Sequence, residues 1–320
     1  MRIILLGPQR RPTVDAAVRL LATLREPTDR PADGPVATVS AGWQEREADD
    51  GELSRVLGGR DVNLRLYQRW LDVQERDPEY VAAERRLSAA LAEMADLYLL
   101  RLDHALQAVY ALQRREAGDR LRSEAVAEAV IAVRDVDAAH LRRVNEARLE
   151  FFDRLRPHDR PAIAEHRAAV AAVLGSASVL VLAGGHVGVL AEVLHLFNVA
   201  AALNEAAPNG APVIAWSAGA MALTDRIVLF HDRAPQGPGH PEVWGSGLSV
   251  VRDVVLLPHA RARLLLDDTP RMAILARRFA PARCVLLEAG TRIEPGADGG
   301  WPAGTRILSE DGHVTALEAA

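Results

Sequence analysis

A long stretch of this chain is nearly free of the residues that break helices. Between Gly59 and Gly175 the only glycine is Gly118, and most of this stretch also lacks proline. It is rich in Ala, Arg, Glu and Leu, which favour helices. Its apolar residues recur at spacings of three and four, which is typical of amphipathic helices. We therefore expect a long antiparallel α-helical hairpin within residues 68–162, with a break near Gly118.

The hairpin must bury its apolar stripe, and two interpretations stay open. In one, it is a dimerisation arm or a cover over an active site. In the other, it is a spacer that packs only on its own chain. The first interpretation predicts a homodimer that forms through the hairpin.

Short apolar runs alternate with helical segments on both sides of the hairpin. This alternation favours a parallel sheet with helices on both faces. We predict an α/β fold with a doubly wound, mostly parallel sheet built from residues 1–67 and 163–320, with the hairpin subdomain of residues 68–162 inserted between the third and fourth strands. The expected strands are 2–6, 36–41, 62–66, 179–183, 213–215, 254–257 and 285–287, with short strands after Thr291, and the expected helices outside the hairpin include 13–24, 52–57, 163–173 and 190–204.

Composition argues against several function classes. The 38 basic and 43 acidic residues leave a net charge of -5, so no basic excess would attract nucleic acid. Residues 177–203 are apolar but contain Gly184-Gly185, which favours a buried strand, turn and helix over a membrane span. The single cysteine, Cys284, cannot form an intramolecular disulfide and lies in an apolar run typical of a core thiol. We expect a cytoplasmic protein without a nucleic-acid or membrane partner.

The sharpest local signal is an apolar strand that runs into a serine and then into a helix, over residues 213–220. The small residues beside Ser217 permit the tight turn of a nucleophile elbow, which exposes the hydroxyl. The helix that begins at Ala218 directs N–H groups and partial positive charge toward a developing oxyanion. The pattern is Ala-x-Ser-x-Gly rather than Gly-x-Ser-x-Gly, so a plain turn stays open as an alternative.

Two other strand ends carry the groups that a nucleophilic serine needs. A serine requires a base, and the base requires an orienting acid. His259 follows the strand 254–257, and Glu288 follows the strand 285–287. Catalytic groups of parallel sheets gather at such carboxyl ends. We predict a triad of Ser217, His259 and Glu288, with a core or solvated histidine and a surface carboxylate as the alternatives.

A glycine pair ends a further strand, at Gly184-Gly185. Paired glycines allow the backbone to approach a ligand and present N–H groups to it. With the N–H of Ala218, they would complete an oxyanion hole. A phosphate loop or a simple turn stays open, although Gly184-Gly185-x-x-Gly188 lacks the dinucleotide-binding spacing.

Five motifs follow one another along the chain: Gly184-Gly185, Trp216-Ser217-Ala218-Gly219-Ala220, Gly245-Ser246-Gly247-Leu248, Pro258-His259 and Leu287-Glu288. In this order they resemble the aspartyl dipeptidase (peptidase E) and cyanophycinase family of serine peptidases. The resemblance covers residues 163–292 well and 1–67 loosely, and it leaves out the hairpin. It implies a fold like that of class I glutamine amidotransferases, with serine replacing their nucleophilic cysteine.

The resemblance also implies roles for individual residues. It makes Ser217 the nucleophile, His259 the general base and Glu288 the orienting acid, with the N–H groups of Gly185 and Ala218 on the oxyanion.

Further residues match the family as binding groups or as an alternative acid. Asp232 is the second choice for the acid. Arg261 and Arg263 resemble arginines that follow the histidine in the cyanophycinase branch, and their guanidinium groups would bind a substrate carboxylate. Gly184 and His186 would contact substrate, with His186 at a position where the family usually has Asn or Asp.

We therefore expect a serine hydrolase that cleaves a short peptide or another small amide without a metal or organic cofactor. His231, Asp232, His240 and Glu242 are of metal-ligating types but lack tight ligand spacing. Two alternatives remain. One is a catalytically silent protein that binds a ligand in the cleft and a partner through the hairpin. The other is an esterase or acyl-transferase that acts on a small molecule.

Overall fold

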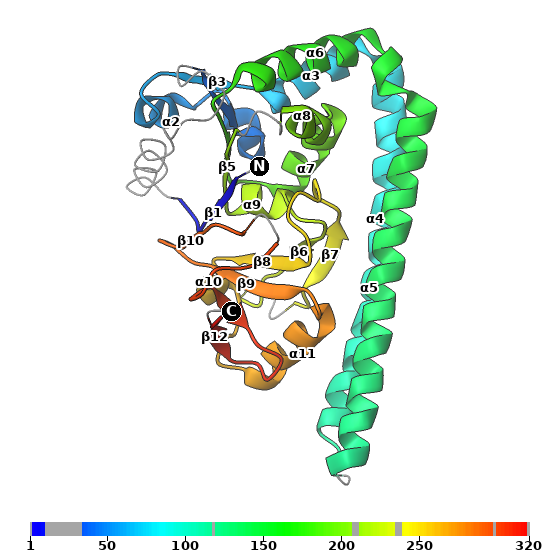
Figure 1. Cartoon of the computed structure of the whole chain (residues 1–320). Coiled ribbons are helices and arrows are strands. Elements are labelled where there is room, and N and C mark those ends of the chain that lie inside the picture. The colour runs from blue at the N-terminus through cyan, green and yellow to red at the C-terminus, as the bar shows by residue number, and fades with distance from the viewer. Residues whose placement is uncertain are drawn as a thin grey trace.

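The computed structural model describes residues 2–9, 34–116, 119–206, 211–233, 239–296 and 299–318. The helix expected over 13–24 and the break expected at Gly118 lie outside these residues. The described part is a mixed α/β fold with a parallel-rich sheet and one long helical element (Figure 1). Its helices are η1 (Ala41–Arg46), α2 (Gly51–Val56), α3 (Leu66–Arg76), α4 (Pro78–Gln113), α5 (Asp119–Leu155), η2 (Pro157–Asp159), α6 (Pro161–Ser176), α7 (Val187–Leu196), α8 (Val199–Ala206), α9 (Ala218–Ala222), α10 (Ala260–Arg263) and α11 (Thr269–Phe279).

The larger sheet has six strands in the order β10-β1-β5-β4-β2-β3. All neighbours from β1 to β3 are parallel, and β10 pairs antiparallel with β1 at one edge. The strands are β1 (Ile3–Leu6), β2 (Val36–Val39), β3 (Asp61–Asn63), β4 (Val179–Leu182), β5 (Val213–Trp216) and β10 (Arg292–Ile293). Because the parallel strands end at one edge of the sheet, the residues that follow them gather there.

Both faces of this sheet are buried, and the side chains of β4 alternate between the two cores. Val179 and Val181 pack in one core with Leu53 of α2, whereas Leu180 and Leu182 pack in the other with residues of α6 and α7. A strand that is buried on both faces is a continuous apolar run in the sequence. The structure thus confirms a parallel-rich sheet covered on both faces, while the doubly wound, amidotransferase-like arrangement stays a prediction.

The later strands form separate sheets rather than extending the first one. Strands β8 and β9 pair in parallel within a four-stranded sheet of order β12-β11-β9-β8, and β6 and β7 form a two-stranded antiparallel ribbon. These strands are β6 (Ile227–Leu229), β7 (Glu242–Gly245), β8 (Val254–Pro258), β9 (Arg283–Leu287), β11 (Arg306–Leu308) and β12 (Val314–Ala316).

Two expected elements end earlier than their apolar patterns indicated, because single residues turn the backbone. The helix expected over 190–204 is divided into α7 and α8 by Asn198, whose φ of 53° is left-handed. Asparagine tolerates this conformation better than most residues. The strand expected to reach Leu66 ends at Asn63, since Arg65, with φ 48°, turns the chain into α3.

The apolar stretch over 177–203 consists of β4, a turn and two helices, as expected. Among the described helices, none combines the length and the apolar character that crossing a bilayer requires. Cys284 lies in β9 and is 1% exposed, and burial raises the pKa of its thiol to about 12. The prediction of a core thiol is confirmed.

Helices α4 and α5 form the expected antiparallel hairpin, which runs along one side of the molecule past β7 and α11 (Figure 1). The Asp77 carboxylate caps α4 by accepting the N–H of Tyr80 at 3.0 Å, and Pro78 occupies the first turn, where no N–H partner is needed. Asp77 also pairs with Arg160 at the start of α6, which ties the base of the hairpin to the α/β body. Buried side chains along the hairpin include Tyr98, Leu102, Leu106, Val109, Val126, Val130, Val133 and Val144.

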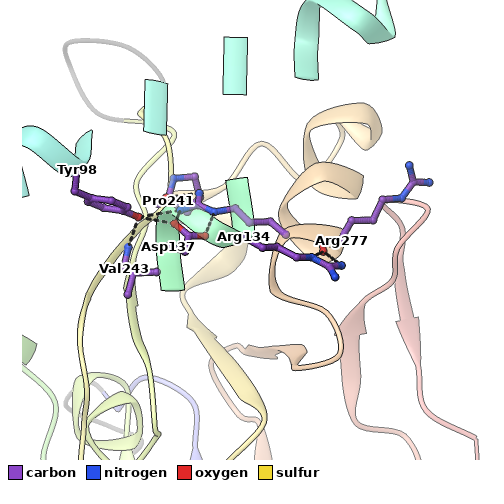
Figure 2. Close-up of polar contacts among 7 residues, drawn as sticks. Tyr98, Arg134, Asp137, Pro241, Val243 and Arg277 are labelled. Carbon is purple, nitrogen blue, oxygen red and sulfur yellow. Dashed lines mark hydrogen bonds and ion pairs between the residues drawn. The ribbon is translucent and has the colours of Figure 1, made fainter. Parts of the chain in front are cut away.

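A buried polar network fastens the middle of the hairpin to the α/β body (Figure 2). Arg278 of α11 donates from Nε to Asp137 Oδ2 at 2.6 Å and from Nη2 to Asp137 Oδ1 at 2.7 Å. The Tyr98 hydroxyl donates to Asp137 Oδ1 at 2.8 Å and accepts from the N–H of Val243 at 3.0 Å. Arg278 Nη1 donates to the carbonyl of Pro241 at 2.6 Å. One face of the hairpin therefore packs on its own chain, and the homodimer stays a prediction.

The central ion pair of this network is almost fully buried, with Arg278 3% and Asp137 4% exposed. Burial disfavours the charged guanidinium, but the hydrogen bond and the charge of Asp137 hold the pKa of Arg278 above its ordinary value. Beside the pair, Arg134 donates from Nε to the carbonyl of Arg277 at 2.9 Å (Figure 2). Removal of one partner of such a pair leaves an uncompensated buried charge.

We expect the substitution Asp137→Leu to lower the free energy of unfolding by about 3–5 kcal/mol, because it leaves the Arg278 charge buried without its ionic partner. Urea denaturation followed by circular dichroism measures this change. The double variant Asp137→Leu/Arg278→Met should recover part of the loss. The control is Glu124→Ala, which breaks the exposed pair with Arg120 and should change the free energy by less than about 0.5 kcal/mol. Equal losses in Asp137→Leu and Glu124→Ala would contradict the prediction.

Candidate active site

Ser217 lies at the turn between β5 and α9 with a backbone that few non-glycine residues adopt. Its φ is 52° and its ψ is -120°, and the residue is only partly buried. A residue other than glycine has a strained backbone when its φ is positive, and such strain clusters at functional sites. This is the geometry of a nucleophile elbow, in which the sharp turn holds the serine hydroxyl out from the end of the strand.

Two glycines make this turn possible by allowing backbones to approach closely. A Cβ built on Gly219 would lie 2.4 Å from the carbonyl oxygen of Leu182 and 2.7 Å from that of Ala183. A Cβ on Gly184 would lie 3.0 Å from the Cβ of Ser217. Gly219 therefore lets α9 begin against the end of β4, and Gly184 leaves space directly beside the serine.

His259 and Glu288 follow neighbouring parallel strands, as the sequence predicted. Strands β8 and β9 are in register at Pro258 and Leu287, so the next residue on each strand is the candidate base or acid. The N–H of His259 donates to the carbonyl of Leu287 at 3.2 Å. Both residues are partly buried. The two side chains therefore come from adjacent positions at one sheet edge.

The turn after β9 also brings Glu288 to the edge of the larger sheet. A Cβ on Gly7 would lie 1.7 Å from the carbonyl oxygen of Glu288, so only glycine fits at the end of β1. Strand β1 pairs with β5, with Leu6 opposite Trp216, and the N–H of Ser217 lies 3.4 Å from the carbonyl oxygen of Leu6. The end of β1 thus lies between the turn that carries Glu288 and the elbow that carries Ser217.

One hydrogen bond holds the Glu288 carboxylate, and a second holds the backbone of the same residue. Its Oε1 accepts the N–H of Arg261 at 2.8 Å, and its own N–H donates to Thr291 Oγ1 at 3.1 Å. Arg261 follows His259 closely in the chain, at the start of α10. The hydrogen bond therefore orients the carboxylate toward the segment that carries the histidine.

A cavity of about 510 Å³ opens at Ser217. The predicted residues Gly185, Ser217, Ala218 and Arg263 line it, and so does Pro258, which precedes His259. The N–H of Ala218 is at the first position of α9, where a helix has no internal acceptor for it. Gly185 has φ 134° and needs to be glycine, because a Cβ there would lie 2.3 Å from the carbonyl oxygen of Gly42.

Some predicted binding residues have other contacts in the structure. His186 caps α7, with its Nδ1 accepting the N–H of Val189 at 3.1 Å. The Asp232 side chain is fully buried, pairs with Arg271 at 2.6 Å and accepts the N–H of Leu265 at 3.2 Å. Asp232 thus anchors the start of α11, which is a structural role.

The two predicted arginines differ in their surroundings. Arg261 is exposed. Arg263 lines the cavity, and its guanidinium lies 5.9 Å from the centre of the Phe230 ring. Burial lowers the pKa of Arg263 relative to its ordinary value. Of the two, Arg263 is the one placed to meet a ligand beside Ser217.

The wall of the cavity that faces the hairpin was not predicted from the sequence. Leu229, Phe230, His240 and Glu242, from the β6–β7 ribbon and its loop, line the cavity together with Met221 of α9. In the sequence, His240 and Glu242 stood out only as residue types that can bind metals, without the spacing of a metal-binding motif. Among the residues that the structure describes, no three His, Cys, Asp or Glu side chains form a group that could hold a metal ion.

One sequence signal would have indicated that the hairpin docks near this wall. Asp137 lies four residues after Val133 and four before Leu141, within the apolar stripe of the second hairpin helix. A charged residue in an apolar stripe is costly unless it is paired. It therefore marks a position where the helix meets an opposite charge.

We expect Gly219→Ala to destabilise the protein by about 1–3 kcal/mol and to lower activity by about 100-fold, because the new Cβ pushes the elbow away from β4. Thermal unfolding and reactivity of Ser217 with a fluorophosphonate measure the two effects. The control Gly175→Ala adds a Cβ near the end of α6 with no heavy atom within 4 Å, so it should be neutral or slightly stabilising. Similar behaviour of the two variants would contradict this account of the elbow.

Comparisons with known proteins find a matching family and a similar solved structure. Residues 157–284, which include Ser217 and His259, match the family described as Peptidase family S51. No curated protein matches the chain. A crystal structure of a peptidase from an acI-B1 Actinobacterium is similar over 99% of this chain and 94% of its own, at 13% identity and a TM-score of 0.46. The family match confirms the resemblance to the dipeptidase E and cyanophycinase peptidases, and with it the enzyme class, a serine-type peptidase.

Proposed function

We propose that this peptidase cleaves short peptides through a triad of Ser217, His259 and Glu288. The observation that carries the proposal is the strained elbow at Ser217, which opens into a 510 Å³ cavity. His259 and Glu288 follow register-paired residues of β8 and β9, and Pro258, which precedes His259, lines that cavity. A nucleophile, a base and an acid that orients the base are what acyl transfer requires.

In the first half of the reaction, Ser217 Oγ attacks the carbonyl carbon of the scissile amide while His259 accepts the hydroxyl proton. The N–H groups of Ala218 and Gly185 stabilise the negative charge that develops on the carbonyl oxygen. His259 then gives its proton to the leaving amine, and an acyl-serine ester remains. In the second half, His259 takes a proton from water, the hydroxide attacks the ester, and Ser217 regains its proton as the acid product leaves.

Glu288 is a better acid for the triad than Asp232. Its carboxylate is only partly buried and is oriented by the N–H of Arg261. The Asp232 carboxylate is already engaged with Arg271 and with the backbone of Leu265. We therefore assign Glu288 to orient His259, and Asp232 to the start of α11.

Arg263 supports a substrate with a carboxylate, as in a short peptide with a free C-terminus. It lines the cavity with Ser217, and a guanidinium binds a carboxylate through two parallel hydrogen bonds. The dipeptidase assignment rests on this arginine and on the family match. A cytoplasmic location and a homodimer through the hairpin stay predictions, the latter supported by the exposed side chains of Leu97 and Leu100 on α4, each 58% exposed.

We expect a fluorophosphonate probe to form one adduct on Ser217, read by intact mass and peptide mapping, because only an activated serine reacts readily. Ser217→Ala should abolish the adduct and lower hydrolysis of short peptides by roughly 10⁴- to 10⁶-fold. The control Ser176→Ala removes an exposed hydroxyl at the end of α6 and should leave both unchanged. Absence of labelling together with absence of hydrolysis across a dipeptide library would contradict the proposed function.

A second comparison separates the two candidate acids. We expect Glu288→Gln to lower kcat by roughly 10⁴-fold, since a neutral amide no longer stabilises the imidazolium. Asp232→Asn should leave kcat nearly unchanged but lower the unfolding temperature, because Arg271 loses its buried partner. Steady-state kinetics and calorimetry on both variants measure these effects. The reverse pattern would make Asp232 the acid of the triad.

A further inference from the structure

Glu242 is an acidic residue in the cavity wall that the proposed triad does not use. It is the first residue of β7, is partly buried, and lines the same cavity as Ser217 and Arg263. Within the described part of the chain, its carboxylate has no hydrogen bond or ion pair with another side chain or with the backbone. Its carboxylate is therefore available to a positively charged group that enters the cavity.

The backbone on both sides of Glu242 is held by the buried network of the hairpin. Arg278 Nη1 donates to the carbonyl of Pro241 at 2.6 Å, and the N–H of Val243 donates to the Tyr98 hydroxyl at 3.0 Å (Figure 2). Further along, Ser246 donates to Asn145 Oδ1 of α5 at 3.0 Å. The hairpin therefore fixes the position of β7, and with it the Glu242 carboxylate at the cavity.

The charges around Glu242 are compatible with the binding of a cation by its carboxylate. The nearby Arg278 is already paired with Asp137, so its charge is largely matched. Burial raises the pKa of Glu242, while the charge of Arg278 lowers it. His240, the neighbouring histidine in the cavity wall, has its pKa lowered by burial and lies 3.5 Å from Asp103.

The cavity therefore has groups of both signs. Arg263 offers a positive charge, and Glu242 offers a negative one on the ribbon that the hairpin holds. His231 also lines the cavity and is exposed. A ligand that satisfies both Arg263 and Glu242 is a zwitterion with an anionic and a cationic group, which describes a short peptide.

We propose that Glu242 is a specificity-determining residue that binds a positively charged group of the substrate, an ammonium or a guanidinium, beside the scissile amide. The proposal rests on the proposed function in that it takes the cavity at Ser217 as the substrate site. The hairpin has a role in this specificity: its Tyr98 and Asp137, together with Arg278 of α11, act as positioning residues that hold β7.

The test is peptide binding to the full chain with the substitution Ser217→Ala, measured by isothermal titration calorimetry, so that no turnover is needed. Three probes separate the two sources of positive charge. Ala-Ala has a free α-ammonium, N-acetyl-Ala-Arg has only a guanidinium, and N-acetyl-Ala-Ala has neither. We expect Ala-Ala or N-acetyl-Ala-Arg to bind more tightly than N-acetyl-Ala-Ala by about 10- to 100-fold, as for a hydrogen-bonded charge.

Adding Glu242→Gln should remove this preference and leave the binding of N-acetyl-Ala-Ala unchanged. The matched control is Glu146→Gln, which removes the same charge from an exposed position on α5 and should keep the preference. Tyr98→Phe deletes the acceptor of the Val243 N–H and should weaken the preference in part. Equal binding of the three probes, no binding of any, or a preference that survives Glu242→Gln would overturn the proposal.

Failure of this inference is distinguishable from failure of the proposed function. Fluorophosphonate labelling of Ser217 in the wild-type chain reports on the triad alone. If Ser217 is labelled while the charge preference is absent from the start, Glu242 is not the specificity residue and the triad stands. If Ser217 is not labelled in the wild type but the charge preference is present and depends on Glu242, the site binds cationic peptides and the triad assignment fails.

Discussion

The guanidinium of Arg278 is where the hairpin, helix α11 and the β6–β7 ribbon meet. It donates to Asp137 on α5, to Tyr98 on α4 and to the carbonyl of Pro241 before β7. A buried guanidinium has donors in a fixed planar arrangement, so all of its partners must be present in the correct geometry. This requirement determines where along the body the hairpin docks, because a shifted register would leave the charges unpaired.

The candidate active site depends on a second constraint, the close approach of backbones at the ends of parallel strands. Gly184 leaves space beside Ser217, Gly219 starts α9 against β4, and Gly7 admits the turn that carries Glu288. None of the three tolerates a Cβ without displacement of a neighbour. The serine can therefore keep its strained φ because the surrounding chain leaves it no alternative.

These two constraints act on the same cavity. The strand ends supply the proposed nucleophile, base and acid, whereas the hairpin holds the ribbon that contributes Glu242. The segment that matches the peptidase family, residues 157–284, thus lies beside a helical hairpin that the family match does not include. In the proposed function, the first provides the chemistry and the second shapes what the cavity accepts.

Much of the fold could be predicted because its signals are local. The apolar runs of β1, β4 and β5, the lack of glycine in the hairpin and the small residues around Ser217 all act within a few residues of where they stand. Two of the errors were local too: Asn198 and Arg65 adopt positive φ values that apolar periodicity does not register.

The sequence by itself determined the strand-to-helix elbow at Ser217, the strand ends that carry His259 and Glu288, and the existence of a helical hairpin. Only the tertiary structure decided that the later strands form separate sheets, that Asp232 pairs with Arg271, and that Glu242 faces the cavity. The physical reason is the separation of the interacting residues along the sequence. Asp137 and Arg278, whose pairing orients the hairpin, are 141 residues apart in the chain. Propensity and periodicity act between near neighbours, whereas a buried ion pair is specified only when the two surfaces that carry it come together.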